Sequence, residues 1–489
     1  MLLGIDIGTS SLKTAIYSRK GQLQWLEKIR YQPDFPQNGW AQIDPLIWYH
    51  ALISALSNCP RSLKQKISAL SFSGQMHGVV ATDIHSNPLY PAILWLDQRA
   101  DGFIEEILQD QVDITLCNNG NQIYNGAMAG SILWLRAQCP DIFKCTAKFL
   151  SPKDWLRTYL TQKSLADLWV SEPSDSSGTL LSNLSGNWDL ALFHYLKLDL
   201  KQFPKIVAST TITGLLAADI AKVLGLPLGV KIIAGGSDTG CAAIGAGFLS
   251  NHHTMLTTGT GAQLITRYTT VPHPKKGLHI FSIPTSYERN QPNHLWYQMA
   301  AMLNCGSVLE WMRCQFAIEW DQIYTEAFSK NTIHDSLDLI AHPWLNGERS
   351  PWMNPKLSAG WVGIKAHHTR KDLIYAMLRS VALSIKIGFE YFDHHSQVAH
   401  LLFAGGGSTH PLWRQMIANA LNKPLHCLDE VDLSAKGAAM LAGLGTNLLT
   451  LADLHYFAPI TVCIVKPEPI ATDDFERHKV NLLESISSL

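Results

Sequence analysis

The chain carries one short pattern twice, about half a chain length apart. Near the N-terminus, strand-like apolar runs at residues 2–7 and 12–17 flank a Gly-Thr-Ser-Ser turn that begins at Gly8. Residues 255–265 repeat this layout around a second Gly-Thr turn, with Gly259 lying 251 positions after Gly8. Apolar runs on both sides of a glycine-containing turn predict a β-hairpin. A repeat at this spacing favours a duplicated chain with two domains.

Segments with strand and helix spacing alternate along the rest of the chain. We expect strands at residues 67–72, 79–82, 230–234 and 401–404. We expect helices, or parts of helices, at residues 46–56, 104–108, 132–137, 155–160, 374–387 and 411–421. This alternation places the chain in the α/β class.

The repeat also sets the expected domain boundary, because the sequence shows no low-complexity linker. We expect an N-terminal domain at residues 1–245 and a C-terminal domain at residues 246–489. Residues 446–489 are rich in leucine and then mixed in composition. We expect them to form closing helices or a tail.

Composition excludes several classes of protein. Lys and Arg number 39 against 40 Asp and Glu, which argues against a broad electrostatic surface for nucleic acid. Only 16% of residues are charged, a low fraction that is also found in membrane proteins. However, the longest apolar stretches, such as residues 438–444, fall far short of the ~20 residues that span a bilayer, which argues against a transmembrane protein. No signal peptide is expected, because the N-terminus has no basic region or cleavage pattern. Nine cysteines without a C-x-x-C spacing favour reduced thiols and a cytoplasmic location.

The two Gly-Thr turns are candidate phosphate-binding loops. Such a turn presents the backbone N–H groups and hydroxyls that a phosphate needs. Asp6, directly before the first turn, could hold Mg²⁺ directly or through water. For either loop alone, the alternative is an ordinary hairpin with glycine in its turn. Neither loop fits the pattern G-x-x-x-x-G-K-[ST], so a P-loop nucleotide hydrolase is disfavoured.

Two glycine-rich segments follow predicted strands. Residues 405–407 lie between a strand and a helix, where glycines let a ligand approach the backbone closely; a plain strand-to-helix turn is the alternative. Residues 235–240 place Asp238 ahead of a run of small residues, where it could act as a general base toward a hydroxyl. Alternatively, Asp238 is a helix N-cap, and spacing alone favours the cap.

Two polar segments have the character of a sugar site. In residues 73–78, His77 lies beside Met76 in a loop flanked by glycines, but a lone histidine is more often satisfied in a core or turn. Trp95 offers an aromatic platform beside the charged side chains of Asp97 and Arg99. A structural ion pair between Asp97 and Arg99 is the alternative there.

Taken together and in order, ten segments resemble the FGGY family of carbohydrate kinases, and within it the xylulokinases. The resemblance covers about residues 2–445, and its most specific segment is Gln-Met-His-Gly at residues 75–78. The ten segments are residues 4–10, 74–78, 92–99, 152–157, 174–179, 235–238, 258–261, 347–351, 405–407 with 413–416, and 436–439. Each motif is weak by itself, whereas ten ordered matches are strong.

The resemblance implies a two-domain, actin-like ATPase fold, with a duplicated ribonuclease-H-like core and an interdomain cleft. It implies ATP and Mg²⁺ as cofactors, with Asp6 positioning Mg²⁺ and phosphate. It also makes Asp238 the base that takes the proton from the sugar hydroxyl, which overturns the preference for a cap. Phosphoryl transfer depends mostly on positioning and charge stabilisation, so glycine-rich loops and a carboxylate suffice.

The resemblance further implies the binding residues. The sugar would contact Gln75, Met76, His77, Trp95, Asp97 and Thr239. The nucleotide would contact Thr9, Ser10, Ser11, Lys13, Gly259, Thr260, Gly261, Gly306, Gly405, Gly406 and Gly407. Family members are often homodimers, and no nucleic-acid or membrane partner is expected.

Four residues depart from the family's usual pattern. Ser131 lies in a segment that lacks the usual lysine before Leu-Trp, and Thr239 replaces a common asparagine near the sugar. Arg379 occupies a position that is usually acidic, and Lys436 a position that is commonly leucine. Since Asp6 and Asp238 are both present, kinase activity is still expected, but Thr239 leaves the sugar open.

The expected activity is ATP- and Mg²⁺-dependent phosphorylation of the terminal primary hydroxyl of a ketopentose, D-xylulose first, to give the 5-phosphate. One alternative is a family kinase for another sugar or polyol, such as D-ribulose or a deoxy-sugar. The other is an actin-fold protein that binds nucleotide or sugar as a sensor without turnover. Intact Asp6 and Asp238 argue against the sensor.

Overall fold

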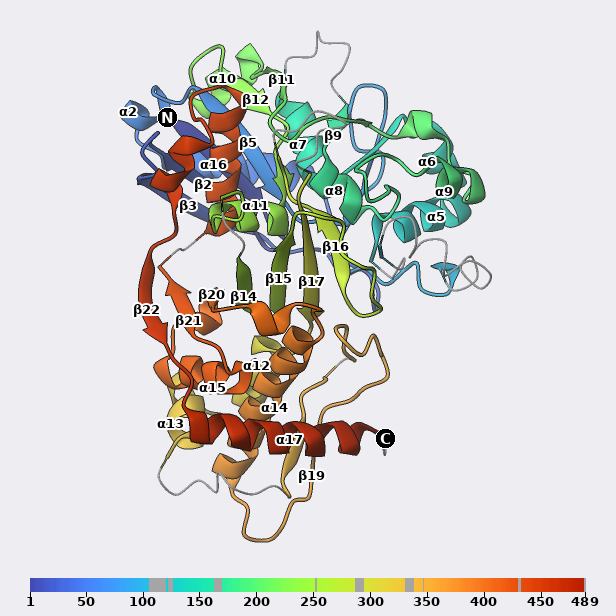
Figure 1. Cartoon of the computed structure of the whole chain (residues 1–489). Helices are drawn as coiled ribbons and strands as arrows, with labels where there is room; N and C mark the ends of the chain where they lie inside the picture. The colour runs from blue at the N-terminus through green and yellow to red at the C-terminus, as the bar shows by residue number, and fades with distance from the viewer. Residues whose placement is uncertain are drawn as a thin grey trace.

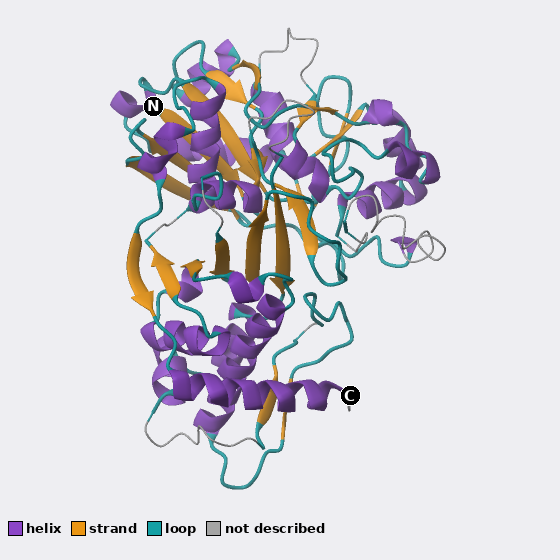
Figure 2. Ribbon diagram, viewed as in Figure 1, coloured by secondary structure: helices purple, strands orange, loops and turns teal. Residues whose placement is uncertain are grey.

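The computed structural model describes residues 1–104, 120–121, 126–161, 169–250, 253–285, 294–329, 338–345, 347–429 and 432–487. Most helices and strands gather around two mixed sheets, one formed mainly by the first half of the chain and one by the second (Figure 1, Figure 2). The N-terminus lies with the first sheet, and the C-terminal helix lies beyond the second (Figure 1).

The first sheet contains the N-terminal hairpin. Its strands, in spatial order, are β11 (Ile212–Leu215), β12 (Lys231–Ile233), β5 (Ala69–Gly74), β1 (Leu2–Ile7), β2 (Ser11–Tyr17) and β3 (Leu23–Arg30). The short β13 (Gly236–Ser237) pairs with the end of β5. Strand β1 is antiparallel to β2 and parallel to β5, which confirms the first predicted hairpin.

The second sheet repeats this central arrangement. Its spatial order is β16 (His279–Ser282), β17 (Trp296–Met302), β15 (Ala262–Tyr268), β14 (Thr254–Thr258), β20 (Leu401–Ala404), β21 (Leu425–Leu428) and β22 (Thr461–Val465). Strand β14 is antiparallel to β15 and parallel to β20, as β1 is to β2 and β5. The second hairpin and the duplication are therefore both confirmed in the fold.

The helices and remaining strands cover and connect the two sheets. The helices are α1 (Leu46–Ser57), α2 (Arg61–Lys64), α5 (Met128–Gln138), α6 (Pro140–Cys145), α7 (Pro152–Leu160), α8 (Pro173–Gly178), α9 (Leu190–Tyr195), α10 (Ala218–Leu224), α11 (Asp238–Gly245), α12 (Gly306–Phe316), α13 (Trp320–Ala327), α14 (Arg370–Glu390), α15 (Pro411–Leu421), α16 (Leu433–Gly445) and α17 (Pro469–Ser487). The short 3-10 helices are η1 (Leu200–Gln202), η2 (His395–Gln397), η3 (Gly406–Ser408) and η4 (Ala452–Phe457). The minor strands are β4 (Gln42–Ile43), β6 (Val80–Thr82), β7 (Ala92–Ile93), β8 (Lys148–Leu150), β9 (Val170–Ser171), β10 (Lys205–Ile206), β18 (Ile340–His342) and β19 (Gly360–Val362).

Most predicted elements form close to their expected places. Helices α1, α5, α7, α14 and α15 include the helical segments expected there. Strands β6, β12 and β20 lie within the expected strands, and β5 overlaps the strand expected at residues 67–72. Of the helix expected at residues 104–108, only Ile104 lies within the described residues.

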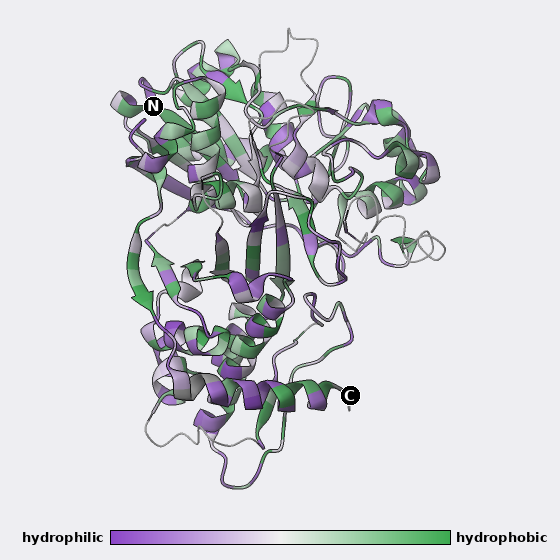
Figure 3. Ribbon diagram, in the orientation of Figure 1, coloured by the Kyte–Doolittle hydropathy of each residue, from purple (hydrophilic) through white to green (hydrophobic). Residues whose placement is uncertain are grey.

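Helix α16 comes from the second half of the chain but packs on the first sheet. It lies beside β1, β2 and β5 and against α11 (Figure 1), and it is mainly hydrophobic (Figure 3). The backbones touch, because a Cβ added to Gly4 would lie 1.9 Å from the carbonyl oxygen of Ala435. A Cβ added to Gly437 would lie 1.9 Å from that of Cys241. A helix from the second half of the sequence is therefore packed directly against the sheet formed by the first half.

The C-terminal segment forms a strand as well as a helix. We expected closing helices or a tail, but β22 pairs antiparallel with β21 and adds an edge to the second sheet. Helix α17 then packs against α14 and α15. A guanidinium nitrogen of Arg379 lies 2.7 Å from Nε2 of His478 on α17, so this departure from the family pattern helps to dock the C-terminal helix. No helix within the described ranges is long and apolar enough to cross a membrane.

Candidate active site

Asp6 and Lys13 face each other on the first hairpin and reach α16. They are register partners on β1 and β2, and Lys13 Nζ lies 3.6 Å from Asp6 Oδ2. Ser73 donates a hydrogen bond of 2.7 Å to Asp6 Oδ1. Lys13 Nζ also lies 2.6 Å from Oδ2 of Asp432, whose Oδ1 caps α16 by accepting the N–H of Ala435 at 2.9 Å. One ammonium thus joins carboxylates from both halves of the chain.

Asp238 is the first residue of α11, but it is not the cap. Ser237 is the N-cap, and its Oγ accepts the N–H of Gly240 at 3.2 Å. The cap role that spacing alone favoured for Asp238 is therefore wrong. The residue as a whole is half-buried, and Oδ1 accepts hydrogen bonds from Thr239 N at 2.6 Å and Thr239 Oγ1 at 3.3 Å.

The electrostatics of this site favour a proton acceptor near neutrality. Burial, and then the charge of Asp6, raise the pKa of Asp238 to about 7, although the hydrogen bonds from Thr239 oppose the shift. Burial and the charge of Asp432 likewise raise the pKa of Asp6, against the opposing effect of Lys13. Three carboxyl groups, those of Asp6, Asp238 and Asp432, therefore interact with the single ammonium of Lys13 or with one another.

These carboxylates fit Mg²⁺ only as part of a larger coordination shell. Among the described residues there is no group of three or more side chains that could hold a metal ion. Mg²⁺ commonly takes one or two carboxylates together with substrate phosphates and water. Asp6, whose carboxylate lies directly before the first turn, fits that role.

Gln75 and Trp95 converge on the first Gly-Thr turn. Gln75 Nε2 donates to the carbonyl oxygen of Gly8 at 3.3 Å, and Gln75 Oε1 accepts from Thr9 Oγ1 at 3.3 Å. Trp95 Nε1 donates to the same Thr9 hydroxyl at 2.8 Å. Two expected sugar residues and one expected phosphate residue are thus brought together, while Ser10 lies exposed beside them.

Met76 and His77 are buried where the first half of the chain meets β16 and β17. Tyr297 donates a hydrogen bond of 3.6 Å to Met76 Sδ, and the His77 ring lies 5.9 Å from that of Phe281. His77 Nδ1 is hydrogen-bonded to the carbonyl oxygen of Gly178. Burial lowers the pKa of His77 to about 4, so its imidazole is neutral at pH 7.

Asp97 and Arg99 form a buried ion pair. Arg99 contacts both oxygens of Asp97, at 2.9 Å through Nε and 2.8 Å through Nη2. Asp97 Oδ2 also accepts the N–H of Ala41 at 2.5 Å, and the guanidinium lies 4.0 Å from the centre of the Trp40 ring. These contacts support the structural alternative for Asp97 over a direct contact with sugar.

The second Gly-Thr turn is packed on the start of α12. Gly306 donates to the carbonyl oxygen of Gly259 at 2.9 Å, and a Cβ added to Gly306 would lie 2.3 Å from that oxygen. The N–H of Ser307 binds the carbonyl oxygen of Thr260 at 2.9 Å. Gly261 is equally restricted, since its added Cβ would lie 2.4 Å from Met302 O. The fold thus fixes this turn, and it leaves open space beside Gly259.

The three glycines after β20 differ in what they contact. Gly405 has a φ of +92°, and its added Cβ would lie 2.3 Å from the carbonyl oxygen of Thr258. The Cβ added to Gly407 would lie 2.5 Å from Thr258 Oγ1. A Cβ added to Gly406 would have nothing within 4 Å. Because β14 and β20 are parallel neighbours, this segment and the second Gly-Thr turn lie at the same edge of the sheet.

Some residues at the site were missed in the sequence. Asp432 contacts Lys13 as described above; the sequence signal that could have found it is an aspartate at the N-cap position of a helix. Arg349 lies with its guanidinium 5.7 Å from the centre of the Trp95 ring; its Gly-Glu-Arg-Ser-Pro segment was noted without a role. Burial, and then the charges of Arg349 and His77, lower the pKa of His279 to about 3, and no sequence pattern marked this residue.

The departures from the family pattern fall in different places. Thr239 binds the candidate base and Arg379 binds α17, as described above. Ser131 and Lys436 are buried on α5 and α16, and nothing in the structure explains either substitution.

Comparison with known proteins gives the same family as the sequence resemblance. Residues 1–245 match the N-terminal domain, and residues 254–446 the C-terminal domain, of the FGGY family of carbohydrate kinases. A xylulose kinase from Staphylococcus xylosus is 29% identical over 91% of this chain and 90% of its own length. One from Escherichia coli is 28% identical over 91% and 90%. The crystal structure of a xyloylose kinase from Brucella ovis aligns with all of this chain and with 99% of its own chain, at 26% sequence identity and a TM-score of 0.88. The chain therefore belongs to the FGGY family of carbohydrate kinases.

Proposed function

We propose that this kinase transfers the γ-phosphoryl group of ATP to the terminal primary hydroxyl of D-xylulose, giving the 5-phosphate. The observation that carries the proposal is Asp238, at the start of α11, with a pKa raised to about 7 by burial and by the charge of Asp6. A carboxylate with a pKa near the working pH is suited to accept a proton from a hydroxyl. Relatives named xylulose kinase across nine-tenths of the chain support the choice of sugar.

In this proposal Asp238 is the general base. The hydrogen bonds from Thr239 hold one carboxylate oxygen, and the other takes the proton of the attacking hydroxyl. Gln75 and Trp95 would hold the sugar beside the first turn. Because Nδ1 of the neutral His77 imidazole donates to the carbonyl oxygen of Gly178, its Nε2 would accept a hydrogen bond from a sugar hydroxyl without adding charge.

The phosphates would lie against the two Gly-Thr turns, with adenosine along residues 405–407. Lys13, which lies between Asp6 and Asp432, would balance negative charge that develops on the transferred group. Mg²⁺, held at Asp6, would supply further charge neutralisation on the phosphate oxygens. We also propose that the protein acts in the cytoplasm. Assembly into a homodimer stays a prediction.

The proposal is tested by measuring ADP release with ATP, Mg²⁺ and a panel of D-xylulose, D-ribulose, D-gluconate and glycerol. We expect the highest kcat/KM with D-xylulose. A preference for D-ribulose would overturn the choice of sugar but leave the kinase assignment. Absence of turnover that depends on any of these acceptors would contradict the proposed kinase activity.

Replacing Gly406 with alanine should weaken ATP binding without disturbing the fold. The added methyl group meets no protein atom within 4 Å, but it would project where we place the adenosine. We expect KM for ATP to rise roughly tenfold, equivalent to about 1.4 kcal/mol, with little change in Tm or in KM for the sugar. Gly360→Ala is the matched control, because its added Cβ also has no neighbour within 4 Å. Equal KM values for ATP in the two variants would contradict this placement.

A further inference from the structure

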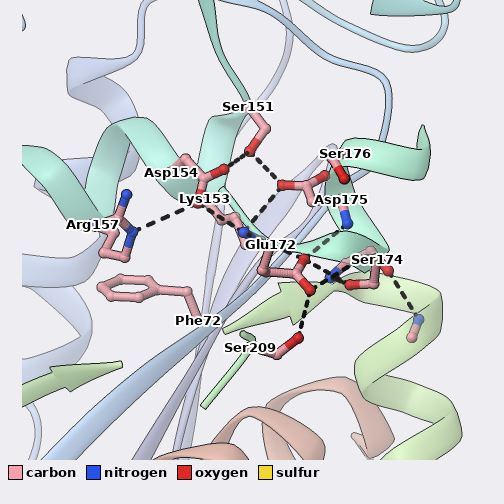
Figure 4. Close-up of polar contacts among 12 residues, drawn as sticks. Phe72, Ser151, Lys153, Asp154, Arg157, Glu172, Ser174, Asp175, Ser176 and Ser209 are labelled. Carbon is pink, nitrogen blue, oxygen red and sulfur yellow. Dashed lines mark hydrogen bonds and ion pairs between the residues drawn. The ribbon is translucent and has the colours of Figure 1, made fainter. Parts of the chain in front are cut away.

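A cluster of five charged residues is buried behind the loop that carries Gln75, Met76 and His77. Its side chains are at most 2% exposed and come from α7, the start of α8 and the residue before it (Figure 4). The members of this Lys153 cluster are Lys153, Asp154, Arg157, Glu172 and Asp175. It packs against the end of β5, because a Cβ added to Gly74 would lie 2.8 Å from Lys153 Cβ.

Lys153 is the central cation of this cluster. Its Nζ lies 2.8 Å from Asp154 Oδ1, 3.2 Å from Asp175 Oδ2 and 3.7 Å from Glu172 Oε1. Arg157 supplies a second cation, with Nε 3.6 Å from Asp154 Oδ1. Such a set of buried charges fixes the positions of its members, since moving one leaves another without compensation.

Glu172 is held by four further donors. Its Oε1 accepts from Ser174 Oγ at 2.7 Å and from the N–H of Asp175 at 2.8 Å. Its Oε2 accepts from the N–H of Ser174 at 3.0 Å and from Ser209 Oγ at 2.7 Å (Figure 4). Because the Ser174 hydroxyl donates its proton to Glu172, its oxygen is left to accept a hydrogen bond from the other side.

That acceptor binds the residue next to Asp238. Ser174 Oγ accepts the N–H of Ser237 at 2.9 Å, and Ser237 in turn caps α11. On its other side, the strand that holds Ser237 pairs with β5. The segment that ends at Asp238 is therefore held between the sheet and a hydroxyl whose orientation Glu172 fixes.

We infer that Ser174, oriented by Glu172, is a positioning residue for the base Asp238. This inference rests on the proposed function. Ser174 itself would touch no reacting atom. It sets the direction in which α11 starts and thus where the Asp238 carboxylate lies. A shift of about 1 Å at a reacting group is enough to cost roughly 100-fold in rate.

The test compares Ser174→Ala with Ser176→Ala in the full-length kinase. Ser176 lies on the same helix, is equally buried, and its Oγ donates to Pro173 O at 3.3 Å. We expect Ser174→Ala to lower kcat roughly 10- to 100-fold while KM for the sugar stays nearly unchanged. Ser176→Ala should keep the wild-type kcat.

Two more readouts separate positioning from a general loss of stability. Misplacement of Asp238 changes its burial and its distance from the charge of Asp6, which together raise its pKa, so the acid limb of kcat/KM should shift in Ser174→Ala alone. Hydrogen exchange measured by mass spectrometry should speed up in peptides spanning the start of α11, again only in that variant.

The outcomes distinguish failure of the positioning role of Ser174 from failure of the proposed kinase function. If the wild type turns over a sugar but the two variants match in kcat, pH profile and exchange, the positioning role is overturned and the proposed function stands. If exchange changes at α11 while kcat does not, Ser174 is structural only and the inference is overturned. If the wild type phosphorylates no sugar, the proposed function fails, and the positioning role fails with it.

Discussion

Asp238→Asn should reduce kcat for sugar phosphorylation by roughly 1,000-fold, within the range usual for loss of a general base. The amide keeps the size of the side chain but cannot accept a proton at neutral pH. Its carbonyl oxygen can still accept the hydrogen bonds from Thr239, so the start of α11 should be preserved. Steady-state ADP release, with KM for both substrates, measures the effect. Asp219→Asn, in the first turn of α10, is a matched control that should leave kcat unchanged.

The same carboxylate should govern the pH dependence of the wild type. Because burial raises the pKa of Asp238 to about 7, kcat/KM should rise with pH and level off above about pH 7. The folded-state pKa exceeds the unfolded one, so the stability linked to this group is present at low pH and is lost as pH rises through 7. At pH 8 the asparagine variant should therefore be at least as stable as the wild type, as thermal unfolding would show. Retention of wild-type kcat by Asp238→Asn would remove Asp238 from the role of base.

Local sequence patterns predicted the parts of this fold that depend on near neighbours. Both hairpins and the α/β alternation follow from apolar spacing and glycine turns, which act within about ten residues. Helix α16 was not predicted: its residues are nearly all small or apolar and nearly all buried, and its packing on the first sheet rests on backbone contacts such as Gly4 with Ala435. No local pattern carries that information, because the two positions lie at opposite ends of the sequence.

The site shows the same division. Asp6 and the glycine turns were predicted from their places in the sequence. The contact of Lys13 with Asp432 forms only because α16, from the second half of the chain, packs on the first sheet. The prediction of the α11 N-cap from spacing was wrong for a different reason. Ser237 and Asp238 are adjacent and both residue types are good caps, so the sequence cannot choose between them. The extended conformation of Ser237 decides it.

Lys153→Met should lower the free energy of unfolding by about 3–5 kcal/mol. It removes the central cation while Asp154, Glu172 and Asp175 stay buried. Removing one partner of a buried ion pair costs about 3–5 kcal/mol, because the remaining charge is left without compensation. The midpoints of urea and thermal unfolding measure the loss. Lys479→Met is the matched control: it breaks contacts with Glu390 and Glu476 that are partly exposed, and it should cost less than about 1 kcal/mol.

The loss caused by Lys153→Met should also depend on pH. Even beside Lys153, burial and the neighbouring carboxylates hold the pKa of Asp175 above its ordinary value, and removal of the ammonium must raise the carboxylate pKa values further. Groups whose pKa is raised in the folded state stabilise it when protonated and destabilise it as pH rises through that pKa. The variant should therefore lose more stability at pH 8 than at pH 6. If its unfolding midpoint falls equally at both pH values, or no further than that of Lys479→Met, the cluster does not rely on Lys153 for charge compensation.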